Sequence, residues 1–155
     1  MGAEKGVGRY VWLVIASLAL VIIGWSLLFG IGGIDFATNY ELEMSGSQFT
    51  TETLESGVVT ALKLATSWIF ILNIWFGAFG LLCAWGLKKG ERFAWKLGIL
   101  WGTLAIAHGI IIAANQVLMA KWSTACPEAL MFGIIGIIAL GCLFAVRKKF
   151  VNPVQ

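Results

Sequence analysis

Four long apolar runs, separated by short charged segments, constrain the fold of this 155-residue chain more than any other feature. They cover about residues 10–31, 57–88, 91–119 and 127–147, and each is long enough for a helix across a ~30 Å hydrocarbon core. Only 12% of the residues are charged, against roughly 25% in a soluble domain. We therefore predict an all-α, polytopic integral membrane protein, with residues 1–155 forming one domain of four transmembrane helices.

The basic residues predict how these helices are oriented. Nine of the 11 lie near the two ends of the chain or between the second and third runs: Lys5, Arg9, Lys88, Lys89, Arg92, Lys96, Arg147, Lys148 and Lys149. Only Lys63 and Lys121 lie elsewhere. Because cytoplasmic segments are rich in Lys and Arg, we expect an up-down-up-down bundle in the plasma (inner) membrane. Both termini are then cytoplasmic, and the loop 35–56 lies outside.

Polar and small residues of the second run lie on one face of the expected helix. They recur at steps of three and four residues: Lys63, Thr66, Asn73, Gly77, Gly80 and Ala84, with Phe70 among them. The other faces are apolar. A narrow stripe of this kind faces protein, and the apolar faces meet lipid. We expect the end of the stripe at Gly77, Gly80 and Ala84 to receive the helix 91–119.

The segment between the second and third runs predicts a tight turn. Lys88 and Lys89 suit the negative end of a helix dipole, and Glu91 suits the positive start of the next helix. Gly90 suits the left-handed residue that ends many helices. The second and third helices should therefore form an antiparallel hairpin and be direct neighbours.

Asn73 and His108 are the two polar residues nearest the middle of their helices. From the charged ends of each run, Asn73 lies roughly 4 Å and His108 roughly 2 Å from the centre, both on the outer side. We expect a hydrogen bond between them, which would satisfy two groups that hydrocarbon cannot. One interpretation is a structural bond with a neutral histidine. The other is that an ionisable residue at this depth marks a proton, cofactor or substrate site.

A second polar group is expected nearer the outer surface, comprising Lys63, Thr66, Ser67, Asn115 and Gln116. In one interpretation Lys63 extends to the headgroups and the others bond to backbone. In the other, Lys63, Thr66 and Asn115 line a polar pocket that opens outward and narrows toward Asn73 and His108.

Small residues of the third run form a seam beside Trp101, His108 and Asn115. The glycines of this seam are Gly98, Gly102 and Gly109, and we assign them, with Gly77 and Gly80, to helix packing.

Absent motifs restrict the function. The sequence has no nucleophile triad, no phosphate-binding glycine loop, no H-E-x-x-H and no basic aromatic surface for nucleic acid. With one histidine and no nearby intramembrane carboxylate, we expect no metal site. The cysteines form no C-x-x-C motif, and we expect no internal disulfide.

We expect a non-catalytic membrane subunit, without a cofactor, that packs within or stabilises a larger complex. Its partners would be lipid and other membrane subunits or further copies of itself, and not nucleic acid. The alternative is a small carrier, channel or lipid-ligand binder that uses the outer polar pocket. A second alternative is haem or chlorophyll binding through His108, since one axial ligand needs only one histidine.

Overall fold

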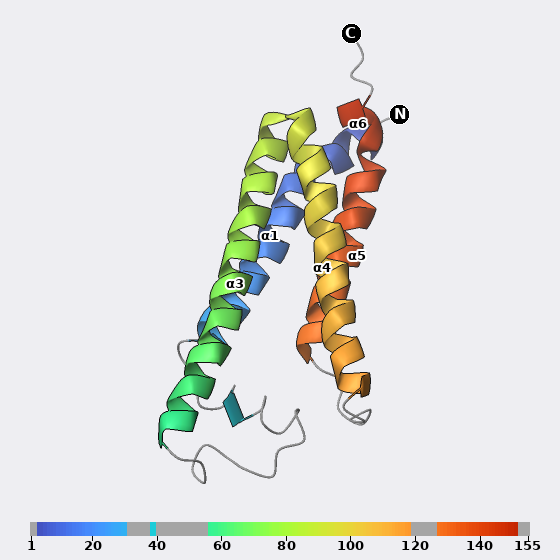
Figure 1. Ribbon diagram of the computed structural model, residues 1–155. Coiled ribbons are helices and arrows are strands. Elements are labelled where there is room, and N and C mark those ends of the chain that lie inside the picture. The colour runs from blue at the N-terminus through green and yellow to red at the C-terminus, as the bar shows by residue number, and fades with distance from the viewer. Residues whose placement is uncertain (1–2, 31–37, 40–55, 119–126, 152–155) are drawn as a thin grey trace.

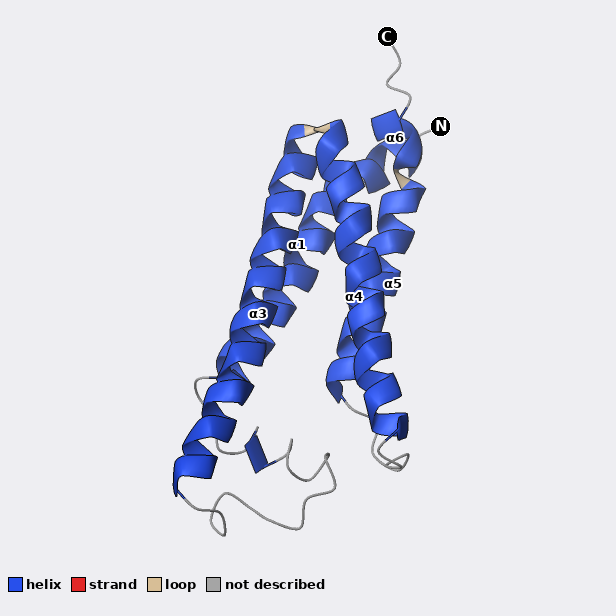
Figure 2. Cartoon of the chain, in the orientation of Figure 1, coloured by secondary structure: helices blue, strands red, loops and turns tan. Residues whose placement is uncertain are grey.

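The fold is all-helical in a computed structural model that describes residues 3–30, 38–39, 56–118 and 127–151 (Figures 1 and 2). Four helices in these ranges are long and apolar enough to cross a membrane. They are α1 (Ala3–Gly30), α3 (Ser56–Lys89), α4 (Arg92–Leu118) and α5 (Pro127–Ala145), and the short α6 (Arg147–Val151) follows α5.

The observed helices differ in length more than the sequence suggested. α3 has 34 residues and α5 has 19, or about 51 Å and 28 Å at 1.5 Å per residue. The bounds of α3, α4 and α5 lie within two residues of the expected ranges, whereas α1 begins seven residues earlier, at Ala3. Most of the expected outer loop, residues 35–56, lies outside the described residues.

The predicted turn after α3 is present in full. Gly90 has a φ of 80°, which confirms the left-handed conformation expected for it. Its N–H donates to the carbonyl of Leu87, and the N–H of Glu91 donates to the carbonyl of Gly86, both at 3.0 Å. These two bonds form a Schellman motif. The turn therefore ends α3 and reverses the chain directly into α4.

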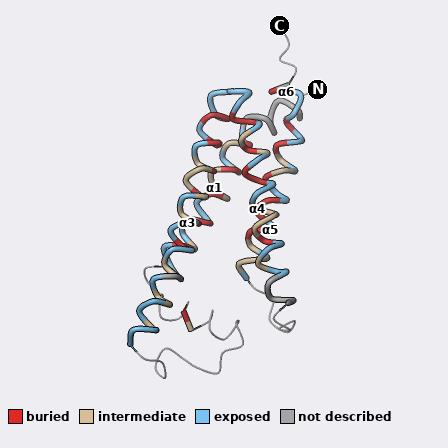
Figure 3. Tube along the Cα trace, in the orientation of Figure 1, coloured by how far each residue is buried: buried red, intermediate tan, exposed pale blue. Residues whose placement is uncertain are grey.

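The helices associate as two close pairs. α1 packs along α3 and α4 packs along α5, and the pairs meet through α3 with α4 and α1 with α5. The start of α1 and the short α6 lie at the same end as the Gly90 turn, and α3 and α4 diverge away from it (Figure 1). Buried residues are accordingly concentrated in the half of the molecule nearest the turn (Figure 3).

Two glycines of α3, Gly77 and Gly80, lie close to α1. A Cβ added to Gly77 would lie 2.5 Å from a side-chain carbon of Ile23 and 3.0 Å from the carbonyl oxygen of Ala19. At Gly80 it would lie 2.7 Å from Trp101 of α4 and 2.9 Å from the Cβ of Ala19. The prediction that this surface receives the third helix is therefore wrong for Gly77, because its nearest neighbours belong to α1.

The glycines of α4 lie against α5. An added Cβ would meet Leu143 at Gly98 and Leu140 at Gly102, each at 3.1 Å, and the backbone oxygen of Ala129 at Gly109, at 2.8 Å. On the facing helix, a Cβ at Gly136 would lie 2.6 Å from the carbonyl oxygen of Gly102. Small residues on both helices thus allow the two backbones to approach closely.

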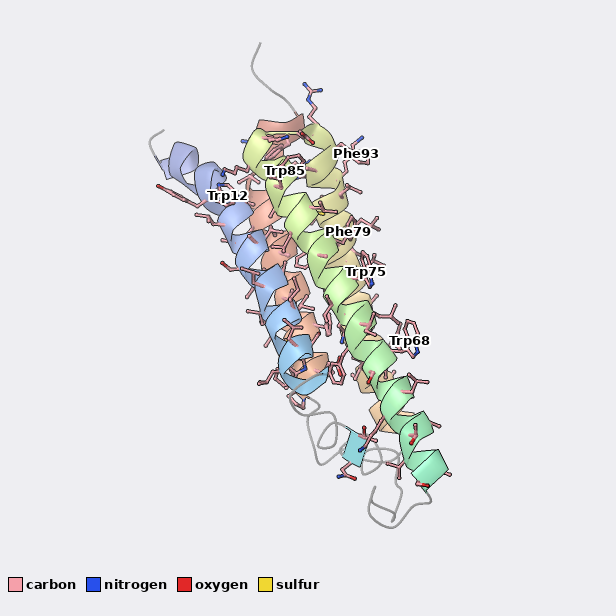
Figure 4. The ribbon with its side chains drawn as sticks, turned by 90° about the vertical axis from the view of Figure 1, so that its left-hand side faces the viewer. Trp12, Trp68, Trp75, Phe79, Trp85 and Phe93 are labelled. Atoms are coloured by element: carbon pink, nitrogen blue, oxygen red, sulfur yellow. The ribbon has the colours of Figure 1, made fainter. Side chains whose placement is uncertain are left out.

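Large apolar side chains cover the outside of the bundle. Figure 4 shows several aromatic residues pointing away from it, among them Trp68, Trp75, Trp85 and Phe93, which are 57–70% exposed. An apolar exterior on four long helices is typical of a membrane protein.

Candidate functional site

The part of the predicted polar stripe from Phe70 to Ala84 faces the protein interior. Phe70, Asn73, Gly77, Gly80 and Ala84 are all buried, and this confirms the face assigned from their spacing. Asn73 is only 4% exposed. Since burying an amide in an apolar interior is costly without hydrogen bonds, the Asn73 side chain requires a hydrogen-bond partner.

That partner is Glu128, on the first turn of α5. The Asn73 Nδ2 donates to Glu128 Oε1 at 2.9 Å, joining α3 to α5 across the two helix pairs. Glu128 is partly buried, and its other carboxylate oxygen has no hydrogen-bond partner among the described residues. We call Asn73 and Glu128 the polar pair.

The predicted hydrogen bond between Asn73 and His108 is wrong. Asn73 bonds to Glu128 instead, and the His108 Nε2 is buried with no hydrogen-bond partner in the described part of the chain. The depth comparison places a residue along a helix axis, but it does not say which helices lie side by side. α3 and α4 contact each other near the Gly90 turn, as at Gly80 and Trp101, and diverge away from it (Figure 1). Equal depth on these two helices therefore does not ensure contact farther from the turn.

An aromatic cluster occupies the interior beside the polar pair. Phe132 of α5 lies edge-on to His108 and Phe76, with ring centroids 4.5 Å and 5.9 Å away. Phe76 stacks on Trp101 at 5.6 Å, and the Trp101 Nε1 donates to the carbonyl of Phe76 at 2.9 Å. Trp101 and Phe132 are 0% and 1% exposed. The cluster therefore joins α3, α4 and α5, and it places His108 against Phe132.

Sequence reasoning missed Glu128 as a site residue. Its position beside Pro127 indicated a residue at the helix end and the membrane interface. The depth comparison could have found it: Glu128 lies about 28 Å from Arg147, and Asn73 about 22 Å from Lys88. The difference between these two distances can be bridged by a glutamate side chain on a tilted helix.

The expected outer polar group is described only in part. The Ser67 hydroxyl donates to the carbonyl of Lys63, one turn earlier, at 2.8 Å. This is the backbone bond expected for a hydroxyl within a helix. Lys63 is half-buried. Thr66 and Asn115 lie on α3 and α4, but their side chains, and that of Gln116, are outside the described ones, so the outward-opening pocket stays a prediction.

No cluster of three or more His, Cys, Asp or Glu residues that could hold a metal ion occurs among the residues the structure describes. Cys83 and Cys142 are both free. A haem or chlorophyll held by His108 would need its Nε2 to face the macrocycle, whereas this atom is buried within the bundle and Phe132 packs on the ring.

The arrangement can bind a group that donates hydrogen bonds or carries positive charge. A partly buried carboxylate attracts such a group more strongly than one in bulk water, because the effective dielectric constant around it is lower. Asn73 holds one oxygen in place, and the other oxygen remains available for a ligand. The chain matches no protein-family model, and neither a curated protein nor a solved structure matches it.

Proposed function

We propose that the chain is an integral membrane protein whose polar pair binds a cationic group. Four helices of sufficient length and apolarity support membrane insertion. The basic residues near the Gly90 turn and the chain ends support an up-down-up-down bundle in the plasma (inner) membrane, with both termini cytoplasmic. Asn73 and Glu128 then lie in the outer half of the bilayer.

The hydrogen bond between Asn73 and Glu128 is the observation that carries this proposal. Ionisable residues within membrane-spanning helices are costly, and functional sites are their most common explanation. A carboxylate favours a protonated amine or another organic cation over a neutral or anionic ligand. The protein would act as a small carrier or binding protein reached from the outer side.

The test uses ethidium as an organic cation and measures its binding to purified protein in lipid nanodiscs by fluorescence. Glu128→Gln removes the charge but keeps an oxygen that can accept the hydrogen bond from Asn73. We expect this variant to weaken ethidium binding on the order of tenfold or more, the loss of about one charge-assisted hydrogen bond. Asn73→Leu should weaken it less.

The matched control is Thr103→Val, which alters an exposed hydroxyl bonded within its own helix. It should bind ethidium like the wild type. Equal binding by wild type and Glu128→Gln would contradict the proposal, as would equal affinity for an uncharged dye of similar size.

An absorbance spectrum of the same preparations tests pigment ligation, because a visible band lost in His108→Ala would favour haem or chlorophyll.

A second candidate function is the non-catalytic subunit of a larger membrane complex. It is favoured by one outward face of α5, which carries Leu130, Ile134, Ile137, Gly141 and Phe144. A Cβ added at Gly141 would meet nothing within 4 Å, so a helix of another protein can approach closely there.

Gly141→Leu should then reduce co-purification of a partner in mild detergent, while Gly24→Leu, at a similarly open position on α1, should not. A native mass equal to that of one chain, with no partner bound, would contradict this second candidate.

A further inference from the structure

We infer that the end of the molecule around the Gly90 turn binds the headgroups of anionic phospholipids. Six exposed basic residues gather there from α3, α4 and α6, and we call them the basic rim: Lys88, Lys89, Arg92, Lys96, Arg147 and Lys148. This inference rests on the membrane insertion proposed above, but not on the polar pair.

The charges of the basic rim are not neutralised within the described part of the protein. None of the six residues forms an ion pair with another described residue, and Glu91 is the only acidic residue near them whose side chain is described. Six positive charges on neighbouring helix ends repel one another, so they favour a polyanionic surface. One or two Lys or Arg residues beside an anionic membrane raise the binding constant roughly tenfold.

Two of the lysines are held against aromatic rings. The Lys88 Nζ lies 4.9 Å from the centre of the Trp12 ring, and the Lys89 Nζ lies 3.4 Å from that of Trp85. Trp12, Trp85 and Phe93 lie toward the same end of the molecule (Figure 4). Tryptophan is enriched at the level of lipid headgroups. The rings therefore keep the two ammonium groups at the depth where phosphates lie.

The remaining cations are held by the packing of α6 and α4. Val146 and Phe150, on either side of Arg147 and Lys148, are 5% and 4% exposed. The Trp95 Nε1 donates to the carbonyl of Leu143 at 2.8 Å and ties the end of α5 to α4. The buried anchors leave the basic side chains outside. Because the backbone beneath the rim is fixed in this way, the backbone loses little conformational entropy when the rim binds headgroups.

Native mass spectrometry tests the inference. Purified protein receives equimolar phosphatidylglycerol and phosphatidylcholine with the same acyl chains, and the ratio of the two bound lipids is measured. We expect a severalfold preference of the wild type for phosphatidylglycerol. In the variant R92Q/K96Q/R147Q/K148Q this preference should fall to a ratio near one, because the four substitutions remove four of the six charges.

Three controls make the result specific. The variant R92K/K96R/R147K/K148R keeps the charges and should keep the preference, and Lys63→Gln, far from the turn, should leave it unchanged. Glu128→Gln should also leave it unchanged, so that failure of the polar pair to bind cations and failure of the rim to bind lipid are distinguishable.

No preference in the wild type, or an equal loss in Lys63→Gln, would overturn the inference. Displacement of bound phosphatidylglycerol by millimolar inorganic phosphate would overturn it as well, because the rim would then recognise phosphate without the lipid.

Discussion

At the scale of single residues, the amide of Asn73 decides how the interior polar groups are arranged. It is 4% exposed and donates to Glu128 at 2.9 Å. Removing either side chain leaves the other in an apolar environment with an unmet hydrogen bond, which costs about 1–3 kcal/mol. The two residues should therefore depend on each other energetically.

A double-mutant cycle measures this dependence. Asn73→Ala, Glu128→Ala and the double variant are unfolded in mixed micelles, and the free energies of unfolding are compared. We expect a coupling energy of about 0.6–2 kcal/mol, the range found for hydrogen bonds between membrane helices. The pair Asn73→Ala and Thr103→Ala, which share no contact, should be additive within about 0.5 kcal/mol. Additivity in both cycles would show that the bond is not formed.

At the scale of helices, the close approach of α4 and α5 depends on where glycines lie. A Cβ at Gly136 would meet the carbonyl oxygen of Gly102 at 2.6 Å and the backbone nitrogen of Ile106 at 2.9 Å. Backbone atoms cannot move aside as the end of a flexible side chain can. Gly141, five residues later on the same helix, has open space around it. The two glycines thus have different roles.

We expect Gly136→Ala to destabilise the protein by about 1–3 kcal/mol, as overpacking does in a close-packed interior. Gly141→Ala should be neutral, or stabilising by up to about 1 kcal/mol, because alanine favours the helix. The measurement is thermal unfolding in detergent, followed by circular dichroism. Equal effects of the two substitutions would be inconsistent with the observed packing of α4 on α5.

At the scale of the whole molecule, the exposed positive charges are concentrated at one end of the helical bundle. The Gly90 turn, the start of α1 and α6 lie at one end (Figure 1), and the basic rim surrounds that end. If the chain crosses a membrane as proposed, this end is the cytoplasmic one.

Reporter fusions at the C-terminus check this orientation. A green fluorescent protein fused after Gln155 should fluoresce, because it folds in the cytoplasm, and alkaline phosphatase fused at the same place should be inactive. Fusion of the phosphatase within the loop 35–56 should give an active enzyme. The opposite pattern would reverse the proposed topology and place the basic rim outside.

The sequence by itself determined the helices, the face of α3 that packs against protein, and the turn at Gly90. These features are local, because they follow from the length of apolar runs, the spacing of small residues and the left-handed conformation that glycine permits. The tertiary structure decided which helices pair: Gly77 meets α1, and Asn73 meets Glu128 and not His108. Helices that are apolar on nearly every face carry little information about their neighbours. Their lateral arrangement depends on side-chain packing around all four helices, which no single segment encodes.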